Sequence, residues 1–163
     1  MVLGLDNAGK TTILKKIGGE TDQNVVPTHG FNIKNYEMGN NILHIWDIGG
    51  QKALRNYWPT FVDDAEGIIF VIDSADEKRL EESGTELINL LEEPELIDVP
   101  IVILANKQDL THSMDQYEVT HLVMVLDNAI FGFGRYPVQG VQCSSVQRNV
   151  RRRPERCFRV DSR

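Results

Sequence analysis

Gly4-Leu5-Asp6-Asn7-Ala8-Gly9-Lys10-Thr11 is the stretch that decides the fold of this chain. It fits the pattern G-x-x-x-x-G-K-[ST] at every fixed position, and its glycines let backbone N–H groups turn toward phosphate oxygens. The apolar residues before it are typical of a strand end, and residues 12–16 are typical of a helix. A helix that begins at such a loop directs its positive end toward a bound anion. The sequence therefore predicts a phosphate-binding loop.

Two side chains of this loop have predicted tasks. Lys10 is expected to reach the β- and γ-phosphates of a nucleotide, and the Thr11 hydroxyl is expected to ligate Mg²⁺. The loop residues expected to contact the nucleotide are Asp6, Asn7, Ala8, Gly9, Lys10, Thr11 and Thr12.

Two further segments fit the same chemistry. Trp46-Asp47-Ile48-Gly49-Gly50-Gln51 follows an apolar run, so Asp47 stands at a strand end where a carboxylate can hold Mg²⁺ through water. The Gly50 N–H can bond a γ-phosphate, and Gln51 can orient an attacking water. Pro27-Thr28-His29-Gly30-Phe31 supplies a second hydroxyl for the metal, from Thr28. The predicted metal ligands are thus Thr11, Thr28 and Asp47.

A fourth segment indicates which base is bound. Asn106-Lys107-Gln108-Asp109 follows the buried-strand run at 101–105. The Asp109 carboxylate can accept hydrogen bonds from the N1–H and the 2-amino group of guanine, and adenine offers no such pair. We expect all four segments to lie at the carboxyl ends of strands, where α/β sheets bind their ligands.

On these motifs, residues 3–110 resemble the ADP-ribosylation factor (Arf) family of small GTPases. Trp46 before Asp47 and the segment 27–32 distinguish the chain from Ras and Rab types. The stretches 31–34, 46–52, 57–58 and 71–76 are most similar to the Arf-like branch, and within it to Arf-like proteins of type three. The resemblance implies a GTP-binding switch that uses Mg²⁺ and hydrolyses GTP to GDP.

The resemblance also implies roles for single residues. Gln51 is the catalytic residue, and turnover is slow without a partner because no arginine stands near Thr28 to act in cis. Asn106 braces the phosphate loop, and Lys107 stacks its stem on the base. Ser145, in a segment resembling the family's Cys-Ser-Ala loop, lies near the guanine O6, although its spacing from the base motif is longer than usual.

The implied partners are proteins that read the nucleotide state. We expect an exchange factor, a GTPase-activating protein and effectors, with effectors contacting Phe31, Ile33, Trp46, Lys52 and Tyr57. Phe31 and Trp46 would equally suit the core. By resemblance to type three, the role is trafficking of lipidated cargo toward the cilium. The alternative within the family is recruitment of vesicle coats, so the expected location is cytoplasmic, with cilium or Golgi association.

Length, composition and charge limit the number of domains, the compartment and the class of partner that we expect. A chain of 163 residues makes one domain, and it has no apolar run of about 18 residues that could span a membrane. Two cysteines, Cys143 and Cys157, fit a reducing compartment. The net charge is −7, but residues 147–163 hold seven arginines and two acids. The acidic body argues against nucleic-acid binding, and we expect a monomer.

The pattern of strands and helices predicts a three-layer α/β P-loop domain. Its sheet should be mostly parallel, with one antiparallel strand from a hairpin at residues 38–41. Strands are predicted at 1–4, 31–37, 42–47, 67–73 and 101–105, and helices near 10–18, 52–60, 77–93 and 115–126.

Both ends depart from the family. The sequence begins inside the first strand and shows neither the amphipathic helix nor the acceptor glycine for a lipid anchor, which leaves membrane association open. We therefore expect an N-terminally truncated GTPase domain at 1–134. Residues 135–163 form a divergent segment, which is either disordered or the product of a shifted reading frame.

Two other classes of protein remain as alternatives. A metabolic P-loop kinase or ATPase would share the phosphate loop, but Asn106, Lys107 and Asp109 argue against it. A non-switching remnant of an Arf-like GTPase would explain both ends. Thermal stability with and without Mg·GDP distinguishes the remnant from a working switch.

Overall fold

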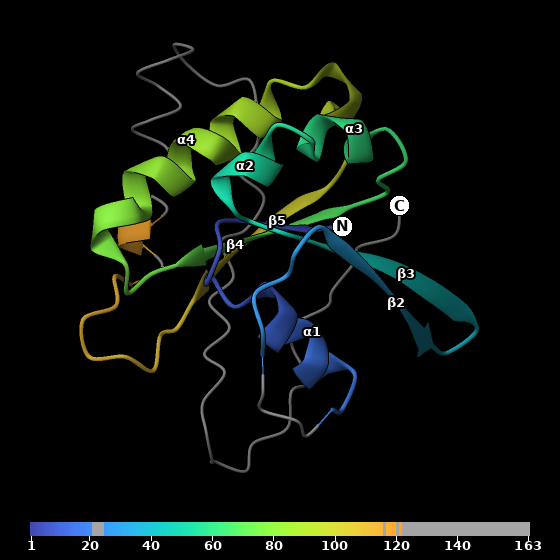
Figure 1. Ribbon diagram of the computed structural model, residues 1–163, viewed down its shortest axis with the longest axis horizontal. Helices are drawn as coiled ribbons and strands as arrows, with labels where there is room; N and C mark the ends of the chain where they lie inside the picture. The colour runs from blue at the N-terminus through green and yellow to red at the C-terminus, as the bar shows by residue number, and fades with distance from the viewer. Residues whose placement is uncertain (21–24, 116, 120, 122–163) are drawn as a thin grey trace.

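The strand that leads into the phosphate loop lies at the centre of a five-stranded sheet (Figure 1). The structure is a computed structural model that describes residues 1–20, 25–115, 117–119 and 121. The strand order is β2-β3-β1-β4-β5. The strands are β1 (Val2–Leu3), β2 (Phe31–Met38), β3 (Asn41–Ile48), β4 (Ile68–Asp73) and β5 (Ile101–Asn106).

The sheet is parallel except for one edge strand, as predicted. β1 pairs in parallel with both β3 and β4, and β4 pairs in parallel with β5. β2 runs antiparallel to β3 over its whole length, from Phe31 opposite Ile48 to Met38 opposite Asn41. The turn between them places Gly39 at φ 62°, a left-handed conformation that glycine adopts without strain. The predicted hairpin is therefore confirmed.

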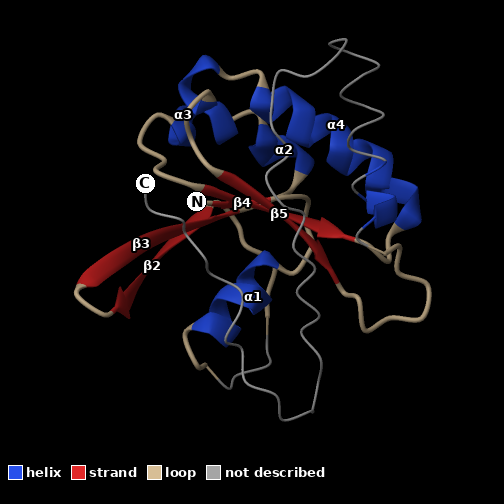
Figure 2. Cartoon of the chain, turned by 180° about the vertical axis from the view of Figure 1, so that it is seen from behind, coloured by secondary structure: helices blue, strands red, loops and turns tan. Residues whose placement is uncertain are grey.

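Helices cover both faces of the sheet, which gives the three layers (Figures 1 and 2). α1 (Lys10–Ile17) lies on one face, and α2 (Lys52–Arg55), α3 (Trp58–Val62) and α4 (Leu80–Leu91) lie on the other. The smaller core packs on the α1 face and includes Val2, Leu14 and Val71. The larger core includes Leu3, Trp58, Phe70 and Leu87. Two cores on opposite faces explain why β4 reads as a continuous apolar run.

The prediction of one continuous helix at 52–60 is wrong, because the structure forms two short helices with Asn56 and Tyr57 between them. Pro59 has no backbone N–H, and its ring would collide with the carbonyl of Arg55 in a continuous helix. α2 therefore ends at Arg55, and Pro59 falls in the first turn of α3, where proline is tolerated.

Other element bounds differ by small amounts. The helix predicted at 77–93 is a 3₁₀ turn, Glu77–Arg79, followed by α4, and a second 3₁₀ turn lies at Pro94–Leu96. β1 stops before Gly4, whose φ of 134° takes the chain out of the strand. Residues 117–119 and 121 are helical, as the predicted helix at 115–126 requires. The rest of that helix, the segment 135–163 and the end of the predicted domain at 134 lie outside the described residues.

Across the described ranges, 1–20, 25–115, 117–119 and 121, no helix is both long enough and apolar enough to cross a membrane.

Candidate nucleotide site

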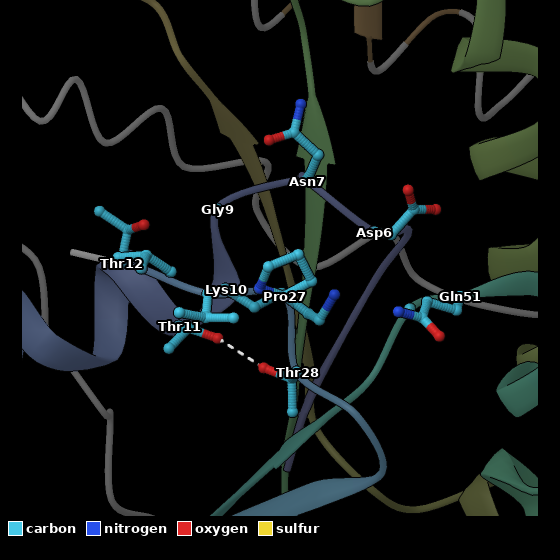
Figure 3. Close-up of a pocket in the computed structure, with 12 residues that line it drawn as sticks. Asp6, Asn7, Gly9, Lys10, Thr11, Thr12, Pro27, Thr28 and Gln51 are labelled. Carbon is cyan, nitrogen blue, oxygen red and sulfur yellow. Dashed lines mark hydrogen bonds between the residues drawn. The ribbon is translucent and has the colours of Figure 1, made fainter.

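A cavity of about 300 Å³ lies over the phosphate loop (Figure 3). It is bordered by the loop, by residues 25–28 and by the Gly50–Gln51 segment. Six of the seven loop residues predicted to contact a nucleotide line it: Asp6, Asn7, Gly9, Lys10, Thr11 and Thr12. Ala8 is buried and does not line the cavity. The cavity therefore brings together three segments that the sequence separates.

Two glycines of the loop are required by close contacts. A Cβ on Gly4 would lie 2.2 Å from the Val71 carbonyl oxygen, and a Cβ on Gly9 would lie 2.3 Å from the Asn106 side-chain nitrogen. Both glycines also have positive φ, 134° and 95°. No other residue fits these positions without moving the loop.

The Lys10 side chain folds back onto two backbone carbonyls at the start of the phosphate loop. Its Nζ donates to the carbonyls of Gly4 at 2.9 Å and Leu5 at 2.8 Å, and its side chain is buried. Burial lowers the pKa of Lys10 to about 8, although the carboxylates of Asp47 and Asp6 oppose this shift. A phosphate group in the cavity would favour the charged form.

The three predicted metal ligands meet at one point. The Thr11 hydroxyl donates to Asp47 Oδ2 at 2.6 Å and lies 3.0 Å from the Thr28 hydroxyl, as Figure 3 shows for the threonine pair. Asp47 is fully buried, and its Oδ1 has no hydrogen-bond partner among the described residues. A buried carboxylate oxygen without a partner is costly. A cation beside the two hydroxyls would satisfy it.

The position of Thr28 relative to its neighbouring strand differs from the prediction. It precedes β2 and does not follow a strand. Because β2 runs antiparallel, its beginning lies at the same edge of the sheet as the ends of β1 and β3. The expectation that all four segments follow strands is therefore wrong for the Thr28 segment. This segment nevertheless lies at the predicted edge of the sheet.

Gly50 and Gln51 border the other side of the cavity. A Cβ on Gly50 would lie within 2.4 Å of the backbone of Gly4, Leu5 and Asp6, so only glycine can approach the loop this closely. Gln51 is half-buried, and its Nε2 is 3.5 Å from His29 Nδ1. The predicted water-orienting side chain thus stands beside the Thr28 segment.

The base-motif residues extend the site beyond the cavity lining. Asn106 donates from its side chain to the Ala8 carbonyl at 2.8 Å. Lys107 has a φ of 64°, and its Nζ lies 2.6 Å from Asp73 Oδ2. Asp109 is exposed at the turn after β5. Ser145, the other predicted base contact, lies outside the described residues.

Two arginines that sequence reasoning missed, Arg55 and Arg79, lie within 4 Å of the Asp6 carboxylate of the phosphate loop. Arg79 donates to Asp6 Oδ1 at 3.1 Å and to Asp76 at 2.7 Å, and the hydrogen bond with Asp76 raises its pKa. Arg55 is buried and donates to Glu82 at 2.7 Å and to Glu86 at 3.0 Å. The i, i+4 spacing of the two glutamates puts them on one helix face, but it does not reveal their partner.

This constellation matches a known family over most of the chain. Residues 1–152 match the family described as "ADP-ribosylation factor family". The chain belongs to the ADP-ribosylation factor family. The resemblance inferred from the sequence motifs is thereby confirmed for this Arf-family chain.

Curated relatives place the chain near Arf-like proteins. It is 51% identical over 119 residues to ADP-ribosylation factor-like protein 3 of Chlamydomonas reinhardtii, covering 73% of this chain and 67% of that protein. It is 50% identical over 121 residues to the protein of the same name in Caenorhabditis elegans, covering 74% and 66%. ADP-ribosylation factor-like protein 2 of Drosophila melanogaster is 46% identical over 127 residues, covering 78% and 69%. The chain thus spans about two thirds of the length of these relatives.

A solved structure supports the same fold. The small GTPase Arl6 of Trypanosoma brucei, determined with the nucleotide analogue GppNp, superimposes with a TM-score of 0.75 at 29% identity. The match covers 88% of this chain and 84% of that one. The three-layer P-loop GTPase fold predicted from the sequence is therefore confirmed.

Proposed function

We propose that this chain is a GTP-binding switch that hydrolyses GTP to GDP and phosphate and recruits effector proteins in the GTP state. Family membership supports guanine-nucleotide binding in general. The observation that carries the proposal is Asp47 Oδ1, which has no hydrogen-bond partner within the described part of the chain. It lies beside the Thr11 and Thr28 hydroxyls, at the edge of a cavity lined by a phosphate loop. Nothing in the core of an inert domain requires this arrangement.

The residues at this point fit Mg²⁺. Hydroxyl and carboxylate oxygens are the ligands that this hard cation prefers, and it is held in such sites together with nucleotide phosphates. Thr11 and Thr28 would hold it directly and Asp47 through water. When bound, it would neutralise charge on the β- and γ-phosphates.

The chain's own residues would supply the remaining functions. Lys10 and the amides of the phosphate loop would hold the phosphates, and the Gly50 N–H would contact the γ-phosphate. Gln51 would orient the attacking water. We propose slow turnover by the chain alone and acceleration by a partner that supplies an arginine or aligns Gln51, on the order of 10³–10⁵-fold.

We propose that the base is guanine and that Asp109 reads it. Asp109 is exposed and therefore accessible to a base, and the Asn106 bond to Ala8 connects this turn to the phosphate loop. Lys107 would cover one face of the base, with its ammonium group anchored on Asp73.

Effectors would read the surface formed by β2, β3 and the segment after Gln51. Phe31, Ile33 and Tyr57 are 47%, 50% and 59% exposed, so their apolar surface is accessible to a partner. Trp46 is only partly exposed and stacks on Phe31, with ring centroids 5.3 Å apart. We propose that this surface receives the effectors, and that an exchange factor and a GTPase-activating protein act at the adjoining cavity.

The similarity to Arf-like proteins supports a proposal for the cellular role. We propose a monomeric, cytoplasmic switch in the trafficking of lipidated cargo, associated with the cilium or with Golgi membranes. A vesicle-coat-recruiting role is the alternative. Pull-down with the protein loaded with GTP analogue against the protein loaded with GDP would separate these roles by the class of effector retained.

Thermal unfolding with different nucleotides tests the biochemical proposal. A ligand at 100 times its dissociation constant adds about 2.7 kcal/mol to the free energy of unfolding. Mg·GDP should raise the unfolding temperature, and Mg·ADP at the same concentration should leave it unchanged. Equal effects of the two nucleotides would favour a P-loop ATPase or kinase, and no effect of either would favour an inert remnant.

A further inference from the structure

Two side chains from the helices after Gln51 hold the peptide groups on either side of Gly50. The indole Nε1–H of Trp58 donates to the Gly49 carbonyl at 3.2 Å. Arg55 Nε donates to the Gly50 carbonyl at 2.9 Å, and this carbonyl also accepts the Asp6 N–H at 3.2 Å. Trp58 and Arg55 are only 2% and 6% exposed. Both donors are therefore fixed by packing.

The bond from Trp58 determines where the next N–H points. The Gly49 carbonyl and the Gly50 N–H belong to one planar trans peptide, so they point in opposite directions. The carbonyl is directed toward Trp58, which lies in the larger core. The Gly50 N–H is therefore directed away from the core, and Gly50 is a lining residue of the cavity.

In the described part of the chain, no group accepts a hydrogen bond from Gly50 N–H. The preceding amide, Gly49 N–H, is by contrast occupied by the Gly30 carbonyl at 2.7 Å. Arg55 and Asp6 hold the following peptide, which prevents Gly50 from rotating as a whole.

We propose that Trp58 is a positioning residue that aims the Gly50 N–H at the γ-phosphate of GTP. Trp58 touches no nucleotide and acts through the Gly49–Gly50 peptide. This inference rests on the proposed function. Its consequence is that Trp58 strengthens the binding of GTP relative to that of GDP, because GDP has no γ-phosphate for this N–H to contact.

The indole N–H should also report the nucleotide state. When an acceptor binds the N–H of a peptide, the carbonyl of that peptide becomes a stronger acceptor, because hydrogen bonds in a chain polarise one another. A γ-phosphate on Gly50 should therefore strengthen the bond from Trp58 to Gly49. The Trp58 indole proton should exchange more slowly with a GTP analogue bound than with GDP bound.

Substitution of Trp58→Phe tests the proposal, since it removes the indole N–H donor and keeps an aromatic ring in the core, although a smaller one. The affinities for GDP and for a non-hydrolysable GTP analogue are measured in the presence of Mg²⁺. We expect the analogue to lose roughly tenfold in affinity relative to GDP, the size of one hydrogen bond to a charged group. The matched control is Val62→Ala, which weakens the same core from the same helix and should leave the ratio of affinities unchanged.

The outcomes separate this inference from the proposed function. A wild-type chain that binds neither nucleotide would overturn the proposed function. A wild-type chain that binds both, with an unchanged ratio in folded Trp58→Phe, would overturn the role of Trp58 alone. If that variant does not fold, the exchange rate of the indole proton in the wild-type chain decides, and equal rates with GDP and analogue would reject the proposal. The chain has two tryptophans, so the Trp58 signal is assigned by elimination with Trp46→Phe.

Discussion

The side-chain amide of Asn106 donates a 2.8 Å hydrogen bond to the carbonyl of Ala8, a residue 98 positions earlier in the chain. Both residues are buried, and Gly9 passes so close that a Cβ there would collide with the same amide. This contact joins the turn that we propose to bind the base to the loop that we propose to bind the phosphates. The two halves of the site therefore keep a fixed spacing.

Asn106→Ala should destabilise the protein and weaken nucleotide binding together. It leaves the buried Ala8 carbonyl without a partner, which costs about 1–3 kcal/mol. Denaturant unfolding with and without Mg·GDP measures both effects. Asn35→Ala, the same change on the exposed part of β2, is the control and should alter neither. Full GDP affinity in a destabilised Asn106→Ala would show that the contact supports the fold only.

Thr11→Val should remove the dependence of GDP binding on Mg²⁺. Valine has nearly the shape of threonine but lacks the hydroxyl that meets Asp47 and Thr28. In the wild-type chain, chelation of Mg²⁺ should speed GDP release, and in the variant release should be fast with or without the metal. Thr85→Val, an exposed threonine on α4, should behave as wild type. A variant that still responds to Mg²⁺ would place the metal elsewhere.

Gln51→Leu should keep the protein in its GTP form. The group that orients the attacking water is lost, while the contacts to the phosphates stay. Single-turnover hydrolysis in the presence of an activating partner should slow by orders of magnitude, and the affinity for GDP, measured on the same sample, should not change. An unaltered rate would exclude Gln51 from the reaction.

Asp109→Asn should change the choice of base. An amide cannot accept both hydrogen bonds from guanine N1–H and the 2-amino group, but it can donate to the 2-oxo group of xanthine. GDP affinity should fall and XDP affinity should rise in competition binding. Asp98→Asn, at another exposed turn, should retain the preference for GDP. Retention of that preference by Asp109→Asn would mean that another residue reads the base.

Nucleotide binding should take up a proton at alkaline pH. The pKa of Lys10 is about 8 in the folded chain and 10.5 in the unfolded chain. Between these values the unfolded state holds the extra proton, so the stability of the nucleotide-free protein should rise with pH across this window. Bound phosphate favours charged Lys10, so GDP affinity should fall as pH rises through about 8.

Calorimetry in two buffers of different ionisation enthalpy measures this proton uptake. Roughly half a proton per GDP is expected near pH 8, and little at pH 7, where Lys10 is already charged. Lys16→Met, an exposed lysine on the same helix, should leave the uptake unchanged. Binding without proton uptake at pH 8 would show that Lys10 does not meet the phosphates.

Much of the fold could be predicted because its signals are local. Gly4 and Gly9 have positive φ within a recognisable loop pattern, and β4 reads as a continuous apolar run because both of its faces are covered. The hairpin turn at Gly39 has the same local origin. Apolar periodicity located α4. In the helix predicted at 52–60, the sequence pattern did not reveal the break at Asn56–Tyr57, where Pro59 interrupts the helix.

The sequence by itself determined the phosphate loop, the alternation of strands and helices and the residues that carry the proposed chemistry, because each depends on side chains a few positions apart. Only the tertiary structure decided that Thr28 meets Thr11 and Asp47 from an antiparallel strand, and that Trp58 and Arg55 hold the peptides around Gly50. These contacts depend on strand order and on which helix covers which face of the sheet. Those features arise from burial summed over the whole domain, which no short segment encodes.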